Sequence, residues 1–122
     1  MTIKRIHSGS PFEEKIGYCR AVVAGGFVHV AGTVGQGDTV EEQCRTALGT
    51  IGWALRQAGA GFSDAVRVTY YLPLASDFEK CWPILAETFG DNPPVATMIE
   101  CGLIDAKYRI EIELTALAPQ TL

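Results

Sequence analysis

The sequence holds few of the side chains on which most hydrolytic and metal-dependent active sites depend. Its 122 residues include two histidines, His7 and His29, so a Ser-His-Asp hydrolase is poorly supplied. The cysteines stand 25, 37 and 20 residues apart, a spacing without the CxxC pair that indicates a zinc site. We expect neither a metal nor a cofactor, and we interpret the four cysteines as buried free thiols: Cys19, Cys44, Cys81 and Cys101.

Positive charge and long apolar runs are scarce as well. The chain has ten Lys and Arg residues and fourteen Asp and Glu residues, which gives a net charge of −4. This charge has the wrong sign for a surface that binds a phosphate backbone. No apolar run approaches the roughly 18 to 20 residues that span a bilayer, and the first residues lead into no signal-peptide core. We therefore expect a cytoplasmic protein with no nucleic-acid partner and no membrane partner.

The composition that remains is that of a single globular domain. Apolar residues make up 48% of the chain and charged residues 20%, which disfavours disorder and a coiled coil. Compact domains usually hold roughly 100 to 150 residues, so residues 1–122 are expected to form one domain.

The first half of the chain predicts a hairpin and then a long helix. Gly25 and Gly26 separate two β-branched runs within residues 20–32, and both can adopt the positive φ of a tight hairpin. Thr39-Val-Glu-Glu42 has the form of a capping box. The following apolar residues recur at the spacing of one helical stripe that ends near Gly59: Val40, Cys44, Ala47, Leu48, Ile51, Leu55 and Ala58.

The second half predicts a strand, a helix and two further strands. Residues 66–72 place Val66, Val68, Tyr70 and Leu72 on one apolar face of a strand. Ser76-Asp-Phe-Glu79 repeats the capping-box pattern and predicts the second helix. Strands follow at residues 95–101 and 108–117, and the latter alternates apolar and polar side chains.

These elements predict an α+β fold with a six-stranded mixed sheet, provided that residues 2–7 form a strand. Two helices can cover only one face of such a sheet, so the other face meets water or another subunit. Glu111 and Glu113 should lie on that open face about 7 Å apart. Arg67, Thr69 and Tyr71 are expected to share it.

Four segments together resemble the RidA family, also called YjgF/YER057c/UK114. They are Gly17-Tyr18-Cys19-Arg20-Ala21-Val22, Phe27-Val28-His29-Val30-Ala31-Gly32-Thr33, Asn92-Pro93-Pro94-Val95-Ala96-Thr97-Met98-Ile99-Glu100 and Ile110-Glu111-Ile112-Glu113-Leu114. The resemblance implies a chorismate-mutase-like fold with two helices on one face. It also implies a homotrimer with small-molecule pockets between its subunits.

The resemblance also implies a set of site residues. Deaminating members hydrolyse an enamine or imine to a 2-keto acid and ammonia with a tyrosine, a glycine amide, an arginine and a glutamate. Tyr18, Gly32 and Glu111 match three of these, but Ala96 stands at the position of the arginine that clamps the substrate carboxylate. The segment of Ala96, Thr97 and Met98 resembles a subgroup without this arginine and is expected to line the pocket.

Two of these residues have alternative interpretations. Glu111 activates a water for attack on a C=N carbon, or it is a solvated strand residue. If Glu111 and Glu113 share a confined cleft without a cation, repulsion favours protonation of one of them. Arg20 lies two residues after Tyr18 and is hypothesised to replace the missing cation. Its alternative is a surface arginine paired with Glu13 or Glu14.

Two functions therefore remain in competition. The first is an enzyme that hydrolyses reactive enamine or imine intermediates to a carbonyl compound and ammonia, with Glu111 and Tyr18 as catalytic residues. The second is a non-catalytic trimer that binds a small metabolite, such as a keto acid, in the same cleft. Ribonuclease activity is disfavoured by the acidic charge balance.

Overall fold

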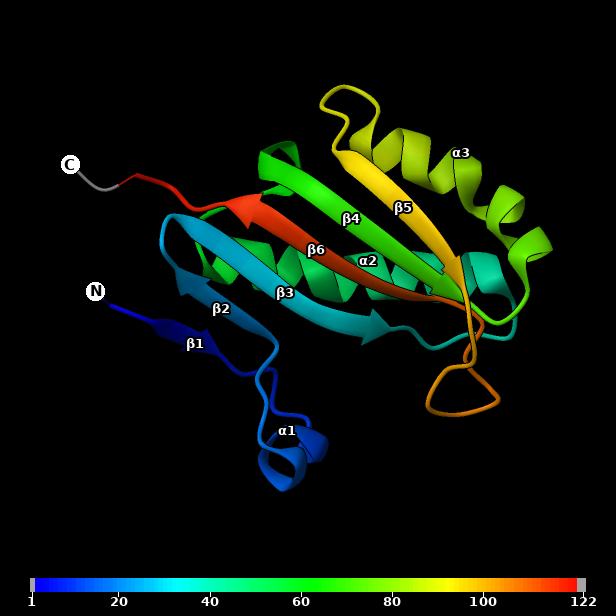
Figure 1. Cartoon of the computed structure of the whole chain (residues 1–122), viewed down its shortest axis with the longest axis horizontal. Helices are drawn as coiled ribbons and strands as arrows, with labels where there is room; N and C mark the ends of the chain where they lie inside the picture. The colour runs from blue at the N-terminus through cyan, green and yellow to red at the C-terminus, as the bar shows by residue number, and fades with distance from the viewer. Residues whose placement is uncertain (1, 121–122) are drawn as a thin grey trace.

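A six-stranded mixed sheet is the framework of the molecule (Figure 1), and the computed structural model describes residues 2–120. Within these residues β4 and β5 run parallel and the other neighbouring strands run antiparallel. The predicted number of strands is confirmed. Their spatial order is β1 (Lys4–Ile6), β2 (Ala21–Ala24), β3 (Phe27–Val34), β6 (Glu111–Leu117), β4 (Ala65–Leu72) and β5 (Val95–Glu100).

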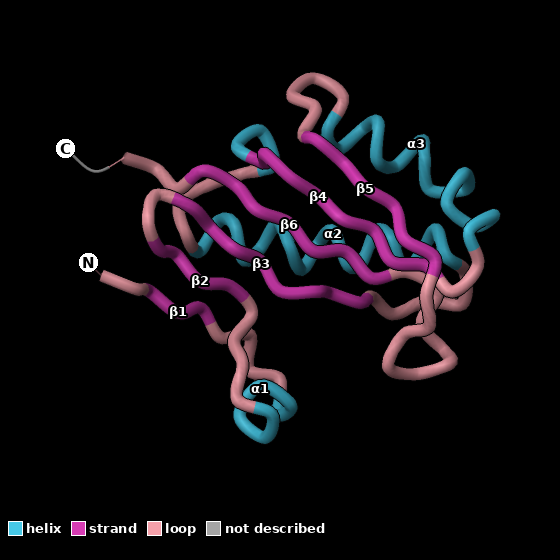
Figure 2. Tube along the Cα trace, in the orientation of Figure 1, coloured by secondary structure: helices cyan, strands magenta, loops and turns pink. Residues whose placement is uncertain are grey.

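Two long helices, α2 (Val40–Gln57) and α3 (Phe78–Phe89), cover one face of this sheet (Figure 2). The side chain of Thr39 caps α2 by accepting a hydrogen bond from the Glu42 N–H at 3.1 Å, as predicted. The apolar stripe of α2 packs against alternate residues of β3, β4 and β6. Among residues 2–120, no helix covers the opposite face of the sheet, as the count of elements predicts.

The hairpin and the alternation in β6 are also confirmed. Gly25 and Gly26 have φ of 61° and 86°, the positive values that a tight turn between β2 and β3 requires. Ile112 and Leu114 of β6 are buried beneath the helices, whereas Glu111 and Glu113 between them are half-buried on the open face. The strand starts at Glu111, three residues later than predicted, although Ile110 is already buried.

The short helix α1 (Pro11–Ile16) is an element that the predicted order lacks. It lies at the end of β1 and β2, apart from α2 and α3 (Figure 1). Ser10 caps it by accepting a hydrogen bond from the Phe12 N–H at 3.4 Å, and Gly17 ends it with φ of 89°. Ser10-Pro-Phe-Glu13 is a capping-box pattern with proline at the first helical position, the signal by which this helix could be predicted.

Two local predictions in the second half of the chain are wrong. Helix α3 begins at Phe78 after a 3₁₀ turn, and Asp77 rather than Ser76 stands at its cap position, without a side-chain capping bond. Asp77 instead turns into the protein, where it forms ion pairs with Arg109 and Lys80. In β4, Val66 is exposed, because the pairing with β6 shifts register between Ala65 and Arg67.

The prediction of buried free thiols holds for two of the four cysteines. Cys44 and Cys81 are buried between α2 and α3, whereas Cys19 and Cys101 are half-buried, and all four are free. Among residues 2–120, no group of three or more His, Cys, Asp or Glu side chains is arranged to hold a metal ion. No helix in this range is both long enough and apolar enough to cross a membrane.

Candidate functional site on the open face of the sheet

The open face brings two glutamates and a tyrosine together from neighbouring strands. Tyr71 of β4 lies opposite Glu111 of β6, and Thr69 lies opposite Glu113. The Tyr71 hydroxyl donates a hydrogen bond of 2.5 Å to Oε1 of Glu113. This arrangement confirms that Glu111, Glu113, Thr69 and Tyr71 share the uncovered face, and Arg67, opposite Thr115, lies on it as well. Glu111 is the carboxylate left without a hydrogen-bond donor among the described side chains.

A bulge in β3 places Gly32 directly beneath the Glu111 carboxylate. The pairing of β3 with β6 passes from Val30 opposite Leu114 to Thr33 opposite Ile112, so Ala31 and Gly32 lie outside the regular register. A Cβ atom on Gly32 would stand 2.5 Å from Oε2 of Glu111. The glycine therefore allows the carboxylate to approach the backbone, because a side chain at this position would collide with it.

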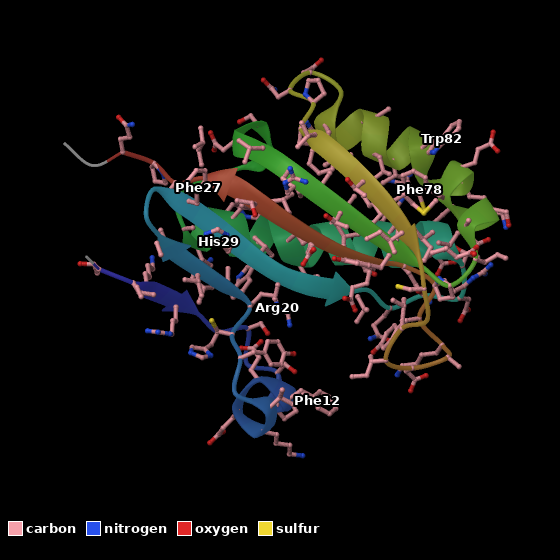
Figure 3. The ribbon with its side chains drawn as sticks, viewed as in Figure 1. Phe12, Arg20, Phe27, His29, Phe78 and Trp82 are labelled. Atoms are coloured by element: carbon pink, nitrogen blue, oxygen red, sulfur yellow. The ribbon has the colours of Figure 1, made fainter. Side chains whose placement is uncertain are left out.

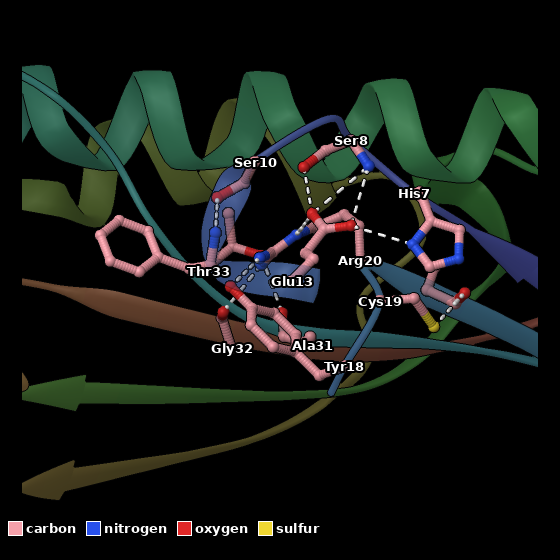
Figure 4. A network of polar contacts seen from close by, with 12 residues as sticks. His7, Ser8, Ser10, Glu13, Tyr18, Cys19, Arg20, Ala31, Gly32 and Thr33 are labelled. Atoms are coloured by element: carbon pink, nitrogen blue, oxygen red, sulfur yellow. Dashed lines mark hydrogen bonds and ion pairs between the residues drawn. The ribbon is translucent and has the colours of Figure 1, made fainter. Parts of the chain in front are cut away.

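Arg20 connects this bulge to Tyr18 (Figure 4). Its Nη1 donates to the carbonyl of Gly32 at 2.9 Å and to the hydroxyl of Thr33 at 3.0 Å. Its Nη2 donates to the hydroxyl of Tyr18 at 3.2 Å, and the guanidinium stands 5.4 Å from the centre of the tyrosine ring. Arg20 is 7% exposed, so it is not a surface arginine, but it does pair with Glu13 as the alternative interpretation predicts.

Glu13 of α1 supplies the counter-charge behind Arg20. Its carboxylate is 3% exposed, lies 4.0 Å from Nε of Arg20, and accepts hydrogen bonds from both the N–H and the hydroxyl of Ser8 (Figure 4). Nδ1 of His7 lies 3.3 Å away on the exposed side. Burial raises the pKa of the Glu13 carboxyl, but the hydrogen bonds from Ser8 and the charge of Arg20 outweigh burial and hold this pKa below its ordinary value.

On the open face the pKa of a carboxyl group is raised instead of lowered. Burial raises the pKa of the Glu111 carboxyl, the charge of Glu113 raises it further, and Arg20 opposes the shift only in part. The hydrogen bond to Glu113 raises the pKa of Tyr71 to about 12. No Lys, Arg or His nitrogen of residues 2–120 lies within 4.0 Å of either glutamate. The surroundings of Glu111 thus favour its protonated form more than water does.

The structure brings together four of the seven predicted site residues, namely Tyr18, Arg20, Gly32 and Glu111. The other three lie on β5. Thr97 is opposite Thr69 and therefore faces the open side of the sheet in the same row as Glu113. Ala96 and Met98 are opposite Val68 and Tyr70, which places both on the helix-covered face.

Ala96 lines a separate apolar groove there, of about 300 Å³, with Phe78 and Trp82 of α3. Figure 3 shows these two aromatic side chains projecting from α3. Within one chain, the position at which the family carries its arginine is therefore separated from Glu111 by the sheet itself.

Of the residues that hold Arg20 in place, the sequence predicts Glu13 as a possible partner and lacks the others. Ser8 and Thr33 complete the network, and no periodicity or motif in the sequence connects them to Tyr18 or Gly32. The cap signal at Ser10 could have placed Glu13 on a helix. Its contact with Arg20, however, depends on how α1 folds back against the end of β2.

Comparison with known proteins identifies the architecture and the family. A crystal structure of a Mycobacterium tuberculosis member of the YjgF/YER057c/UK114 family superposes with a TM-score of 0.93 at 41% identity, covering 96% of this chain and 100% of that chain. The family model described as Endoribonuclease L-PSP matches residues 10–118. The chain belongs to the RidA (YjgF/YER057c/UK114) family. Its fold is accordingly the chorismate-mutase-like fold that the resemblance implies.

Other members of the RidA family differ in how their function is described. An uncharacterized protein of Streptomyces coelicolor is 34% identical over 93% of this chain and 91% of its own length. The human 2-iminobutanoate/2-iminopropanoate deaminase is 27% identical over 94% of this chain and 90% of its own length. RidA relatives with a named activity thus include imine deaminases, at low identity.

Proposed function

We propose that this RidA-family protein hydrolyses small reactive imines or their enamine tautomers to a carbonyl compound and ammonia. The observation that carries the proposal is the position of the Glu111 carboxylate, which covers Gly32 on a face that no helix occupies. Tyr18 is tied to the same glycine through Arg20. The deaminase activity named for the human relative supports this class of reaction.

The reaction adds water across a C=N bond. Glu111 is placed to orient a water and accept its proton as the oxygen attacks the carbon, a role that requires a carboxylate within hydrogen-bond reach. Tyr18 accepts a hydrogen bond from Arg20, so its own hydroxyl hydrogen is directed to another acceptor, which we propose is the substrate. A second proton transfer to nitrogen then releases ammonia and leaves the carbonyl product.

We also propose that the working unit is a homotrimer with its pockets between subunits. Every residue of β5 is exposed in the single chain. As the edge strand of the sheet, β5 also presents a row of unpaired backbone groups, which a second chain could cover. The open face beside it carries the exposed apolar side chains of Val95 and Ile99. Three copies of the 13.1 kDa chain would have a mass of about 39 kDa.

One observation favours a second candidate function, a trimer that binds a small metabolite without transforming it. Ala96 cannot form the charge-assisted pair with a substrate carboxylate that an arginine forms. Without that clamp the site lacks the means to hold the imino-acid substrates named for the human relative, so loss of deamination with retained binding of another metabolite fits Ala96. The ribonuclease activity in the family description receives no support from this face, because Glu111 and Glu113 would repel a phosphate backbone.

The test supplies imines that a flavin oxidase generates in place, from amines and from amino acids, with catalase present. Borodeuteride added at fixed times converts the remaining imine into a deuterated amine that mass spectrometry counts. We expect the protein to lower the standing imine concentration, the Glu111→Gln variant to lose this effect, and Glu87→Gln on the exposed surface of α3 to retain it. Unchanged imine with every substrate would refute hydrolysis and favour the binding function.

A further inference from the structure

Three of the five N–H groups of the Arg20 guanidinium already donate to acceptors of its own chain. Nη1 donates to Gly32 and Thr33, and Nη2 donates to Tyr18, at distances from 2.9 to 3.2 Å. The side chain is 7% exposed and lies within 4.0 Å of the buried Glu13 carboxylate. An incoming carboxylate would have to compete with these acceptors, or with Glu13 on the Nε side, to form a bidentate pair. Arg20 therefore positions Tyr18 and the bulge, and a ligand carboxylate would reach it only in competition with these acceptors and with Glu13.

The charges around the site consequently do not favour an anion. Glu13 offsets the positive charge of Arg20 at close range, while Glu111 and Glu113 have no cation of residues 2–120 within 4.0 Å. Two guanidinium groups, that of Arg20 and that of Arg67 farther along the same face, thus stand against three carboxyl groups. Even with Glu111 protonated, the remaining charges leave no net positive charge to attract a carboxylate.

We propose that the site acts on imines that carry no carboxylate, with a neutral or protonated nitrogen, and discriminates against the imines of amino acids. This inference rests on the proposed function and defines its substrate class. A protonated imine, R–CH=NH₂⁺, is attracted to Glu111 and Glu113, and its reaction with water yields R–CHO and NH₄⁺. The imine of an amino acid carries a carboxylate on the carbon next to the C=N bond. Binding would desolvate this carboxylate beside the two glutamates, which is unfavourable without a paired cation.

A matched pair of substrates separates the two classes. An amine oxidase converts 3-methylbutylamine into an imine without a carboxylate, and an amino-acid oxidase converts leucine into the same carbon skeleton with one. The imine remaining is counted by the borodeuteride method at equal rates of generation. We expect the hydrolysis rate per protein molecule to be at least about tenfold higher for the imine without the carboxylate, the factor that roughly one unfavourable charge contact produces.

The pair of neighbouring residues Glu13 and Glu14 supplies the matched variants. Glu13→Gln removes the buried counter-charge of Arg20, whereas Glu14→Gln removes an exposed charge from the same helix. The quantity compared is the ratio of the hydrolysis rate of the imine without a carboxylate to that of the leucine-derived imine. We expect Glu13→Gln to lower this ratio severalfold and Glu14→Gln to leave it unchanged. Far-ultraviolet circular dichroism establishes that the variants are folded, and the ratio measured on the unmodified protein tests the inference even if Glu13→Gln does not fold.

The outcomes distinguish this inference from the proposed function. Equal or faster hydrolysis of the leucine-derived imine would overturn the inference while the proposed function stands, because a cation from elsewhere would then serve the carboxylate. Hydrolysis of neither imine would overturn both. Faster hydrolysis of the imine without a carboxylate, with a preference that depends on Glu13, supports both.

Discussion

The carboxylate of Glu111 lies over the Cα atom of Gly32, at a distance that leaves no room for a Cβ atom between them. Gly32→Ala should therefore displace the carboxylate, since the end of a flexible side chain moves more easily than the bulged backbone of β3. We expect imine hydrolysis to fall about 100-fold, the cost of a misplacement on the order of 1 Å. The free energy of unfolding, measured with urea, should change by less than about 1 kcal/mol.

Gly49→Ala is the control for this substitution. Gly49 lies in α2, where an added Cβ atom meets nothing within 4 Å, so alanine should stabilise the helix by up to about 1 kcal/mol and leave hydrolysis unchanged. Full activity of Gly32→Ala would mean that the Glu111 carboxylate does not act from the position it occupies over Gly32.

The raised pKa of Glu111, which suits this residue to proton transfer, should also make its ionised form destabilise the protein at neutral pH. Burial and the charge of Glu113 raise its pKa in the folded state above the ordinary 4.5. Its contribution to stability is therefore fully present below pH 4.5 and is lost as the pH rises through the raised pKa. We expect Glu111→Gln to have a higher Tm than the unmodified protein at pH 8, with the difference vanishing near pH 4.

Calorimetry of both proteins across this range, with Glu87→Gln as an exposed control, measures the effect. A Tm difference that stays constant from pH 4 to pH 8 would show that the charge of Glu111 is not the cause. The expected gain in stability together with lost hydrolysis is the trade-off typical of a site that holds a group in an unfavourable environment.

The elements of this fold follow from local patterns, whereas the site follows from contacts that no local pattern encodes. Alternation in β6 was sufficient to place Glu111 and Glu113 on one face and Ile112 and Leu114 on the other, because the side-chain period of a strand is fixed. The position of Ala96 could not be predicted in this way. Its face depends on the parallel register of β5 with β4, which relates residues far apart in the sequence.

The same distinction explains Arg20 and Asp77. Arg20 is expected either to replace the missing cation or to pair with Glu13 or Glu14 at the surface, and Asp77 is expected only within a capping box that begins at Ser76. Both are in fact buried, Arg20 beside Glu13 of α1 and Asp77 against Arg109, which lies 32 residues away. Buried charges require such partners, but the sequence reveals neither the burial of Arg20 nor the contact between Asp77 and Arg109.

The exposed edge of β5 predicts how the trimer can be dissociated. Val95 and Ile99 are 58% and 41% exposed on the open face beside this edge, and a lysine at each position would introduce charge where a second chain is expected to pack. We expect the Val95→Lys, Ile99→Lys double variant to sediment as a 13.1 kDa monomer and the unmodified protein to sediment at about three times that mass. Glu87→Lys is the control for an added lysine. A double variant that keeps the trimer mass would place the subunit contact elsewhere.

Asp77 should contribute more to stability than any exposed ion pair of the chain, because it joins the start of α3 to the segment before β6. Its carboxylate is buried, and Oδ2 accepts hydrogen bonds from Nε and Nη2 of Arg109 at 3.2 and 2.9 Å. Burial raises the pKa of Asp77, but the partners Lys80 and Arg109 outweigh burial and hold it below 3.8. The contribution of this charge to stability is therefore present above pH 3.8 and is lost as the pH falls through the lowered pKa.

Asp77→Ala should lower the free energy of unfolding in urea at pH 7 by about 3 kcal/mol, since the remaining arginine is only partly able to reach water. Lys80→Ala removes an exposed partner of the same carboxylate and should cost less than about 1 kcal/mol. Equal costs for the two variants would mean that the pair with Arg109 adds nothing beyond a surface contact, and a cost for Asp77→Ala that persists unchanged at pH 3 would mean that packing rather than charge is responsible.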